Sequence, residues 1–188
     1  MLTGNSKYDK LLPKHQKKIV LCLAKNEPMT MSQTNRKLRG ENTSTTRAFH
    51  ALEAKGMIKE TGKTEYRGRT FSKYWLTERG AAFALLNGAN PEIIRTVSLA
   101  LGRDRIYFDI RDISPRIANV LDVTLLFDGV LKPEELIKRI VIEVATLNEN
   151  ERLQFLNVIR DSGKFEDAIK NTMDKMKKFM DELKKTKE

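Results

Sequence analysis

The stretch TSTTRAFHALEAKGMIKE, residues 43–60, combines the apolar spacing of a helix with an unusual polar face. One face follows the i, i+3, i+4, i+7 spacing of a helix that packs on a core, and it consists of Thr45, Ala48, Phe49 and Leu52. The opposite face consists of Thr43, Ser44, Arg47, His50, Ala51 and Ala54. This second face lacks the long acidic and basic side chains of an ordinary solvated helix, so we expect a binding partner to approach it closely.

Length and composition describe an ordinary globular chain. Its 188 residues suit one domain or two small ones, and 40% apolar with 32% charged residues is typical of a folded protein. No apolar run of the first half is longer than that of residues 19–24, which is too short to span a bilayer or to form the core of a secretory signal. The single cysteine, Cys22, lies in that run, which predicts a packed core thiol in a cytoplasmic protein without a membrane association. With two histidines and one cysteine, we expect no zinc site and no other cofactor.

The net charge of +10 is confined to the first part of the chain. Residues 1–80 carry 17 Lys and Arg against 7 Asp and Glu, whereas residues 81–188 carry 18 of each. A basic surface can serve solubility alone, but solubility does not require the charge to be confined to one segment. The distribution therefore favours an anionic polymer as the ligand of the first part.

The basic part reads as three helices, a β-hairpin and a fourth helix. The helices are expected over residues 13–25, 32–38 and 43–55, and the hairpin begins near Met57 and returns through FSKYWL, residues 71–76. Tyr66 and Trp75 are expected to be half exposed on that hairpin. The residues expected to cap or turn the chain are Ser32, Gly40, Thr43 or Ser44, Gly56, Gly68 at the hairpin tip, and Thr77 at the start of the fourth helix. Three helices, a two-stranded wing and a following helix are the layout of a winged helix-turn-helix domain.

Two motifs in this region resemble those of winged-helix transcriptional regulators of the MarR and PadR type. In that family a Leu-x-x-x-Gly-hydrophobic-Ile run ends the recognition helix, and a Leu-Thr-x-x-Gly motif follows the wing. The matching residues are Leu52, Gly56 and Ile58 for the first motif and Leu76, Thr77 and Gly80 for the second. The resemblance covers roughly residues 14–88, and it departs from the family at Thr34 and Asn35, where these proteins usually place an apolar residue and alanine. It implies a DNA-binding domain over residues 1–88.

The resemblance assigns the quoted stretch the role of recognition helix. Such a helix enters a major groove about 12 Å wide, which would explain the short side chains on its outer face. The hydroxyls of Ser44 and Thr46 suit phosphate oxygens or base edges, Arg47 suits a guanine, and His50 reaches a base or a phosphate. Helix capping is the alternative role for the hydroxyls, and plain solvation is the alternative for Arg47.

The hairpin would act as the wing and lie along the DNA backbone or in the minor groove. The wing residues expected to contact DNA are Lys63, Arg67, Arg69 and Lys73. A basic hairpin that only protects a sheet edge from aggregation is the alternative.

Residues 89–188 read as a helical domain without a second basic stripe. Helices are expected from Pro91 to about residue 101, over residues 115–127 and 132–147, and after a capping box formed by Asn148 and Glu151. Residues 103–113 fit either a helix or an extended segment. The last helix carries a heptad seam of about two and a half repeats, Ile169, Met173, Met176, Met180 and Leu183. The seam suits either core packing or self-association.

Motifs of catalysis are missing from the sequence. It contains no phosphate-binding glycine loop, no H-E-x-x-H and no G-x-S-x-G. Residues 103–112 alternate carboxylates with arginines, the pattern of surface ion pairs rather than of a nuclease site. We therefore expect a binding protein and no enzyme.

These observations predict a mainly helical protein with a small β-hairpin wing. Residues 1–88 would form a winged helix-turn-helix domain that binds double-stranded DNA sequence-specifically, and residues 89–188 a helical domain for homodimerisation or for binding a protein partner. A two-fold dimer would read two half-sites and so discriminate better among competing sequences than one module. Transcriptional regulation is the function expected. The alternatives are a structural DNA-binding adaptor in plasmid partition, replication or chromatin organisation, and a winged-helix scaffold that binds only proteins.

Overall fold

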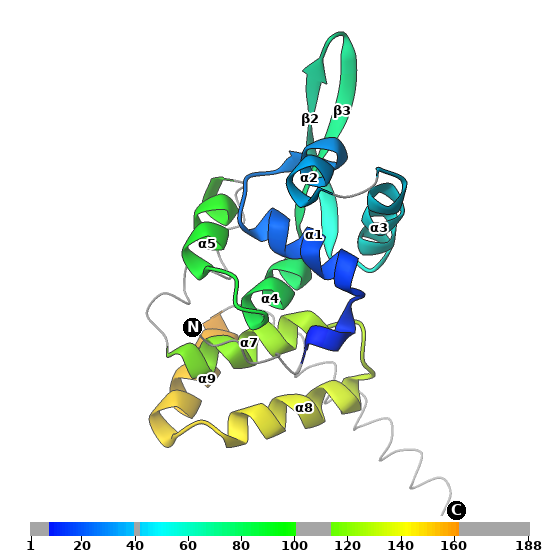
Figure 1. The fold of residues 1–188 in the computed structure, drawn as a ribbon. Helices are drawn as coiled ribbons and strands as arrows, with labels where there is room; N and C mark the ends of the chain where they lie inside the picture. Colours follow the sequence, from blue (N-terminus) through cyan, green and yellow to red (C-terminus); the bar gives the residue numbers. More distant parts are fainter. Residues whose placement is uncertain (1–7, 40–41, 101–113, 162–188) are drawn as a thin grey trace, which may run out of the picture.

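Helices make up most of the structure, and a small antiparallel sheet projects from them (Figure 1). The computed structural model describes residues 8–39, 42–100 and 114–161. The elements in chain order are η1 (Asp9–Leu11), α1 (Lys14–Ala24), β1 (Met29–Thr30), α2 (Met31–Leu38), α3 (Asn42–Ala54), β2 (Ile58–Tyr66), β3 (Arg69–Leu76), α4 (Glu78–Leu86), α5 (Pro91–Ala100), α7 (Pro115–Phe127), α8 (Pro133–Ala145) and α9 (Glu149–Asp161). The prediction of a mainly helical chain with a small hairpin is confirmed.

The sheet has three strands in the described residues, not the two that the sequence predicts. Strands β2 and β3 form the hairpin, and the short strand β1 pairs with the other edge of β3, so that the order is β1-β3-β2. Strand β1 has only two residues, Met29 and Thr30, and a segment so short carries no alternating pattern that sequence analysis can recognise.

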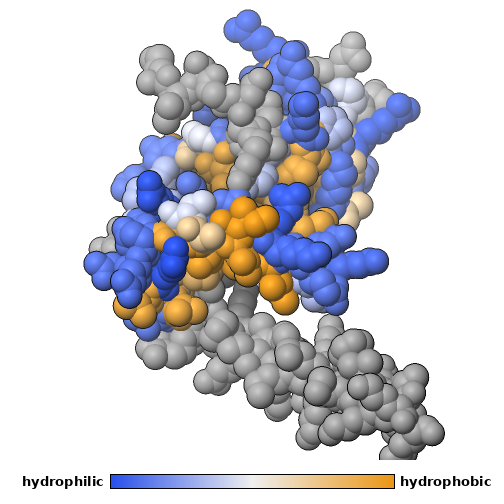
Figure 2. Space-filling view, turned by 90° about the horizontal axis from the view of Figure 1, so that it is seen from below, coloured by the Kyte–Doolittle hydropathy of each residue, from blue (hydrophilic) through white to orange (hydrophobic). Residues whose placement is uncertain are grey.

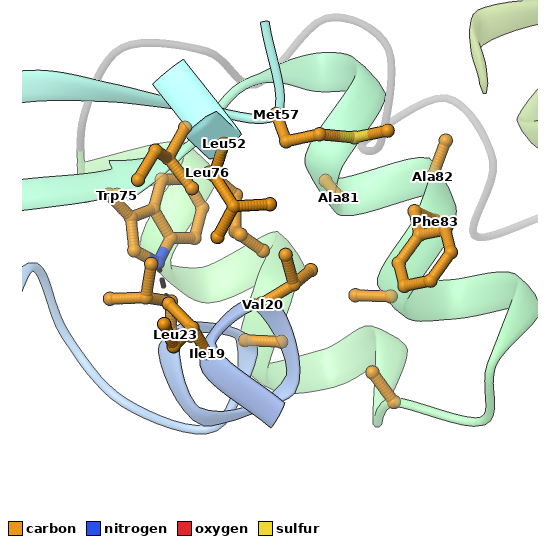
Figure 3. Packing of buried hydrophobic residues seen from close by; sticks show 14 of the residues in the cluster. Ile19, Val20, Leu23, Leu52, Met57, Trp75, Leu76, Ala81, Ala82 and Phe83 are labelled. Atoms are coloured by element: carbon orange, nitrogen blue, oxygen red, sulfur yellow. Dashed lines mark hydrogen bonds between the residues drawn. The ribbon is translucent and has the colours of Figure 1, made fainter. Parts of the chain in front are cut away.

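The core lies where α1, α3 and α4 meet the root of the hairpin (Figure 3). The indole of Trp75 is 1% exposed, and its Nε1 donates a hydrogen bond of 3.3 Å to the carbonyl oxygen of Leu23 in α1. On the other face of β3, the ring of Tyr74 packs edge-on against Phe49 of α3, with 5.3 Å between the ring centroids. Because helices cover both faces of the strand at this level, the prediction that Trp75 is half exposed is wrong. Tyr66, far out on the hairpin, is 62% exposed.

The two motifs that carry the family resemblance contact each other. The Thr77 hydroxyl caps α4 by accepting a hydrogen bond of 3.1 Å from the Gly80 N–H, and it donates one of 2.5 Å to the Gly56 carbonyl oxygen at the end of α3. The Thr77 N–H donates to the Met57 carbonyl oxygen at 3.1 Å. Gly80 packs so closely on this turn that a Cβ atom would lie 1.9 Å from the Met57 carbonyl oxygen. The turn after α3 and the first turn of α4 are therefore locked together.

Helix α2 ends at Leu38 as predicted, but it starts before the predicted cap. Its N-cap is Thr30, not Ser32: the Thr30 hydroxyl accepts from the Gln33 N–H at 3.2 Å, and the Gln33 side chain accepts from the Thr30 N–H at 2.8 Å. This reciprocal capping box satisfies two backbone N–H groups, which Ser32 inside the helix does not do. The residue in the left-handed conformation at its end is Arg39, with φ 51°, while the predicted terminator Gly40 lies outside the described residues.

Helix α3 begins at Asn42, so Thr43 and Ser44 lie inside its first turn rather than at the predicted cap. Its end agrees with the prediction, because Gly56 has φ 63° and the Met57 N–H donates to the Leu52 carbonyl oxygen at 2.9 Å.

The departure from the family at Thr34 and Asn35 has a structural role. Thr34 is fully buried, and its hydroxyl donates to the Thr30 carbonyl oxygen at 3.1 Å. The Asn35 side-chain oxygen accepts a hydrogen bond of 2.7 Å from the hydroxyl of Thr45, which is itself 1% exposed. A polar contact therefore joins α2 to the inner face of α3.

The hydrophobic core continues past residue 88, the boundary proposed from the sequence. Helix α4 packs along α7, and residues of α5 and α7 such as Ile94, Val123 and Leu126 belong to the same buried cluster as α1 and α3. A smaller cluster joins α7 to α9, and its buried residues are Ile117, Val120, Leu147 and Phe155.

Among the described residues, no helix combines the length and the hydropathy that a membrane-spanning segment requires. The segment 103–113 and the heptad seam 169–183 lie outside the described residues.

The predicted capping box before α9 is confirmed. The Asn148 side-chain oxygen accepts from the Glu151 N–H at 2.9 Å, and a Glu151 carboxylate oxygen accepts from the Asn148 N–H at 3.0 Å. The same carboxylate accepts from the Ser114 hydroxyl at 2.9 Å. These hydrogen bonds favour the charged form and hold the pKa of Glu151 below its ordinary value.

The close approach at Gly80 makes a substitution there costly. Gly80→Ala places a methyl group against the Met57 backbone, and we expect a loss of about 1–3 kcal/mol or more in the free energy of unfolding. Urea unfolding followed by circular dichroism measures it. Gly62→Ala is the matched control, because no atom lies within 4 Å of its added Cβ, and it should leave the stability nearly unchanged. Equal effects of the two substitutions would contradict the locked turn.

The capping box makes stability depend on pH. Because the pKa of Glu151 is lowered by folding, its carboxylate stabilises the protein above the ordinary glutamate pKa of about 4.3, and this contribution is lost as the pH falls below that value. Glu151→Gln should therefore lower Tm at pH 7, with the difference from the parent shrinking in acid. Glu149→Gln, in the same turn of α9 but outside the box, should give a smaller difference. A gap for Glu151→Gln that is constant from pH 7 to pH 3 would exclude this mechanism.

Candidate nucleic-acid interface

Helix α3 divides into a buried face and an exposed face, as its sequence predicts. Phe49 and Leu52 are fully buried, and Thr45 and Ala48 are at most 7% exposed. The four candidate residues of the helix, Ser44, Thr46, Arg47 and His50, are all exposed. The structure therefore presents hydroxyl, guanidinium and imidazole groups along a single helix surface. His50 Nδ1 lies 3.9 Å from a carboxylate oxygen of Glu53, also at the surface.

The start of α1 extends this face, which the sequence analysis missed. His15 Nε2 lies 3.4 Å from the Ser44 hydroxyl oxygen, and the Gln16 side-chain oxygen accepts a hydrogen bond of 2.8 Å from Lys55 Nζ. A hollow of about 520 Å³ lies between the two helices, lined by Pro13, His15, Gln16, Ser44, Arg47, Ala48 and Ala51. No local signal in the sequence links residues 15 and 44, because their contact arises only when α1 packs on α3.

A second hollow, of about 400 Å³, separates α3 from the hairpin. Its lining residues come from β1 and α2, from α3 and from β3, and they are Thr30, Met31, Ser32, Asn35, Thr45, Thr46, Thr70, Phe71, Ser72 and Tyr74. Hydroxyl groups predominate on its walls. Thr70 and Ser72 were missed by the sequence analysis, although they share the strand periodicity of Tyr74, which packs on α3.

The hairpin ends in a tight turn that carries a charge at its tip. Tyr66 pairs with Arg69, so the loop consists of Arg67 and Gly68, with φ values of 51° and 68°. Positive φ at both positions is the geometry of a type I′ turn, in which the first position favours asparagine, aspartate or glycine. The guanidinium of Arg67 lies over the Tyr66 ring, 5.2 Å from its centroid. An arginine that takes an unfavourable backbone conformation at an exposed tip points to a role for its charge.

The pairing register places the predicted wing cations on different faces of the hairpin. Lys63 pairs with Ser72, which lines the hollow beside α3, so Lys63 belongs to the face toward that helix. Arg69 and Lys73 alternate with Ser72 along β3 and belong to the opposite face. Arg69 is exposed, whereas Lys73, nearer the root, is partly buried. The structure therefore brings only part of the predicted set toward α3.

This surface is rich in hydrogen-bond donors. It offers hydroxyl donors, guanidinium groups and two imidazoles, and in the part of the chain that the structure describes no three His, Cys, Asp or Glu residues gather as a metal site requires. No family model matches this chain, and no curated protein sequence matches it.

The turn geometry predicts that Arg67 can be replaced without damage to the hairpin. Arg67→Asn should leave Tm unchanged or raise it, because asparagine adopts positive φ more readily than arginine. The expected gain in the free energy of unfolding is at most about a few tenths of a kcal/mol. Thermal unfolding followed by circular dichroism measures the change. Arg67→Val, a β-branched residue that disfavours positive φ, is the opposing control and should lower stability. If the asparagine variant is the less stable of the two, the turn is not of type I′.

Proposed function

We propose that the protein binds double-stranded DNA through a winged helix-turn-helix domain formed by residues 14–88, with α3 as the recognition helix. The observation that carries the proposal is the exposed α3 face of short hydroxyl side chains and Arg47, which lies next to a projecting hairpin with arginines at its end. Three helices followed by a hairpin and a further helix agree with the resemblance found in the sequence. Transcriptional regulation is the biological role that this binding suggests.

The exposed face of α3 suits a major groove. An α-helix with short side chains fits a groove about 12 Å wide, whereas long side chains would hold it away from the base edges. In this arrangement Arg47 donates to a guanine, and Ser44 and Thr46 donate to phosphate oxygens or base edges. His50, one turn after Thr46, reaches the next base or phosphate. The hydrogen bond from Thr45 to Asn35 supports the arrangement from behind, because it holds the inner face of α3 against α2.

The hairpin suits the neighbouring DNA backbone or minor groove. Its strand β2 has nine residues, a length of about 30 Å when extended, so the tip lies well beyond the body of the domain (Figure 1). Arg67 and Arg69 at this end carry charges that attract phosphates and narrow minor grooves. The excess charge of residues 1–80 favours association with DNA and makes affinity depend on salt.

The helical second half would join two copies or hold a protein partner. A structural DNA-binding adaptor remains the second candidate, since an assembly protein needs the same DNA surface together with a further interaction surface. The two differ in selectivity: a regulator binds one operator much more tightly than random duplex, and an adaptor binds both with similar affinity.

Binding of duplex DNA by full-length variants separates base reading from backbone contact. Arg47→Ala should cost about 1–3 kcal/mol on a preferred site and flatten the base preference at one position. Arg69→Ala and Arg67→Asn should weaken binding to all sequences, and each should lower the salt slope by about one. Fluorescence anisotropy over a salt series, after selection of bound sequences from random duplex, provides both measurements.

The charge-matched control is Lys132→Ala, at the start of α8 and far from the hairpin, which should leave affinity and salt slope unchanged. If Arg47→Ala leaves the base preference untouched, α3 is not the reading helix. A parent protein that binds no duplex at low salt would exclude DNA binding and favour a scaffold that contacts only proteins.

A further inference from the structure

Helix α8 exposes apolar side chains on the face turned away from the other described residues. Its inner residues Leu136, Ile140 and Val144 are partly buried against the two hydrophobic clusters. On the outer side, Ile137, Val141 and Ile142 are 46%, 59% and 65% exposed. Figure 2, which views the molecule from the α8 side, shows apolar side chains gathered in a patch bordered by hydrophilic ones. Three large aliphatic side chains left in water on one short helix indicate an interaction surface.

Acidic side chains lie at the first end of this apolar face and an arginine lies at the other, while Lys132 also stands at the first end and Glu149 at the second. Glu134 and Glu135 lie in the first turn of α8. At the other end, the Arg152 guanidinium donates a hydrogen bond of 3.3 Å to the carbonyl oxygen of Ala145, the last residue of the helix. Along α8 the acids and Ala145 are about 16 Å apart, too far for a contact within one molecule.

Along α8, the charged ends and the outer residues Ile137 and Ile142 are centred on the same position. The position halfway between Glu134 and Ala145 lies between residues 139 and 140, and so does the position halfway between Ile137 and Ile142. A two-fold axis through this point turns the face onto itself. Ile137 then meets Ile142 of a second copy, and the acidic end meets the Arg152 end. Such a face is complementary to itself, which is the requirement for the interface of a two-fold dimer.

We propose that α8 packs antiparallel against α8 of a second copy of this chain, with Ile137, Val141 and Ile142 at the centre and with Glu134 and Glu135 facing the partner's Arg152 at both ends. Antiparallel packing also sets the positive N-terminal end of each helix dipole beside the negative C-terminal end of the other. Lys138, between the apolar residues, covers the contact with its aliphatic stem and keeps its ammonium group in water.

The dimer leaves the candidate nucleic-acid interface accessible. Helix α8 lies at the end of the molecule opposite the hairpin (Figure 1). The second half of the chain has no net charge, so two copies meet there without the repulsion that the basic first half would cause. The inference rests on α8 alone and stands whether or not the protein binds DNA.

Sedimentation equilibrium of the full chain at micromolar concentration tests the proposal. The parent should be a dimer, and Ile137→Glu with Ile142→Glu should raise Kd for self-association about tenfold or more, because carboxylates of the two copies would then face each other across the two-fold axis. The matched control is Leu153→Glu with Leu156→Glu, which changes two exposed leucines of α9 in the same way and should remain dimeric. Circular dichroism verifies that all variants keep the helical content of the parent.

Charge exchange tests the antiparallel register. Glu134→Arg with Glu135→Arg should weaken the dimer, Arg152→Glu should weaken it as well, and the three substitutions together should restore it, because the opposite charges then face each other again across the two-fold axis. A monomeric parent would overturn the proposal. So would a dimer that survives the α8 substitutions, that is lost in the α9 control, or that the exchange of charges fails to restore.

Discussion

The arrangement of the first half depends on three consecutive carbonyl oxygens at the end of α3. Those of Lys55, Gly56 and Met57 accept hydrogen bonds from the Arg79 guanidinium at 3.2 Å, the Thr77 hydroxyl at 2.5 Å and the Thr77 N–H at 3.1 Å. Strand β2 leaves directly after this turn, and β3 arrives directly before Thr77. The start of α4 therefore fixes the end of α3 and both strands of the hairpin at the same point, which sets the direction of the helix relative to the hairpin.

This constraint determines which surface remains for a ligand. With Phe49 and Leu52 held in the core and Tyr74 packed against α3, the side chains of Ser44, Thr46 and Arg47 lie on the outer side of the helix. The Arg79 guanidinium also donates to the carbonyl oxygen of Asp128, at the end of α7. A single side chain therefore connects the end of α3 with the second half of the chain. The shared hydrophobic core links the same two parts of the chain.

The two halves distribute polar and apolar surface differently. In the first half, charged and hydroxyl groups lie on projecting elements, and a backbone conformation unfavourable for arginine is accepted at the hairpin tip. In the second half, α8 leaves aliphatic side chains in water between charged ends. Both features are locally unfavourable in an isolated molecule. We infer that each is maintained by what binds there, an anionic polymer at the first and a second copy of the chain at the other.

The order of the helices, the hairpin and the amphipathic division of α3 could be predicted from the sequence, because they follow from local apolar spacing and from glycines such as Gly56 and Gly68. The capping box of Asn148 and Glu151 could be predicted as well, since it joins residues three apart. Long-range packing, by contrast, accounts for the burial of Trp75, the third strand β1, the groove residues Thr70 and Ser72, and the approach of His15 to Ser44. Each of these depends on residues far apart in the chain, and such contacts leave no periodic pattern in a single sequence. The continuation of the core from α4 into α7 was hidden for the same reason: composition and charge change near residue 80, but hydrophobic packing does not follow charge.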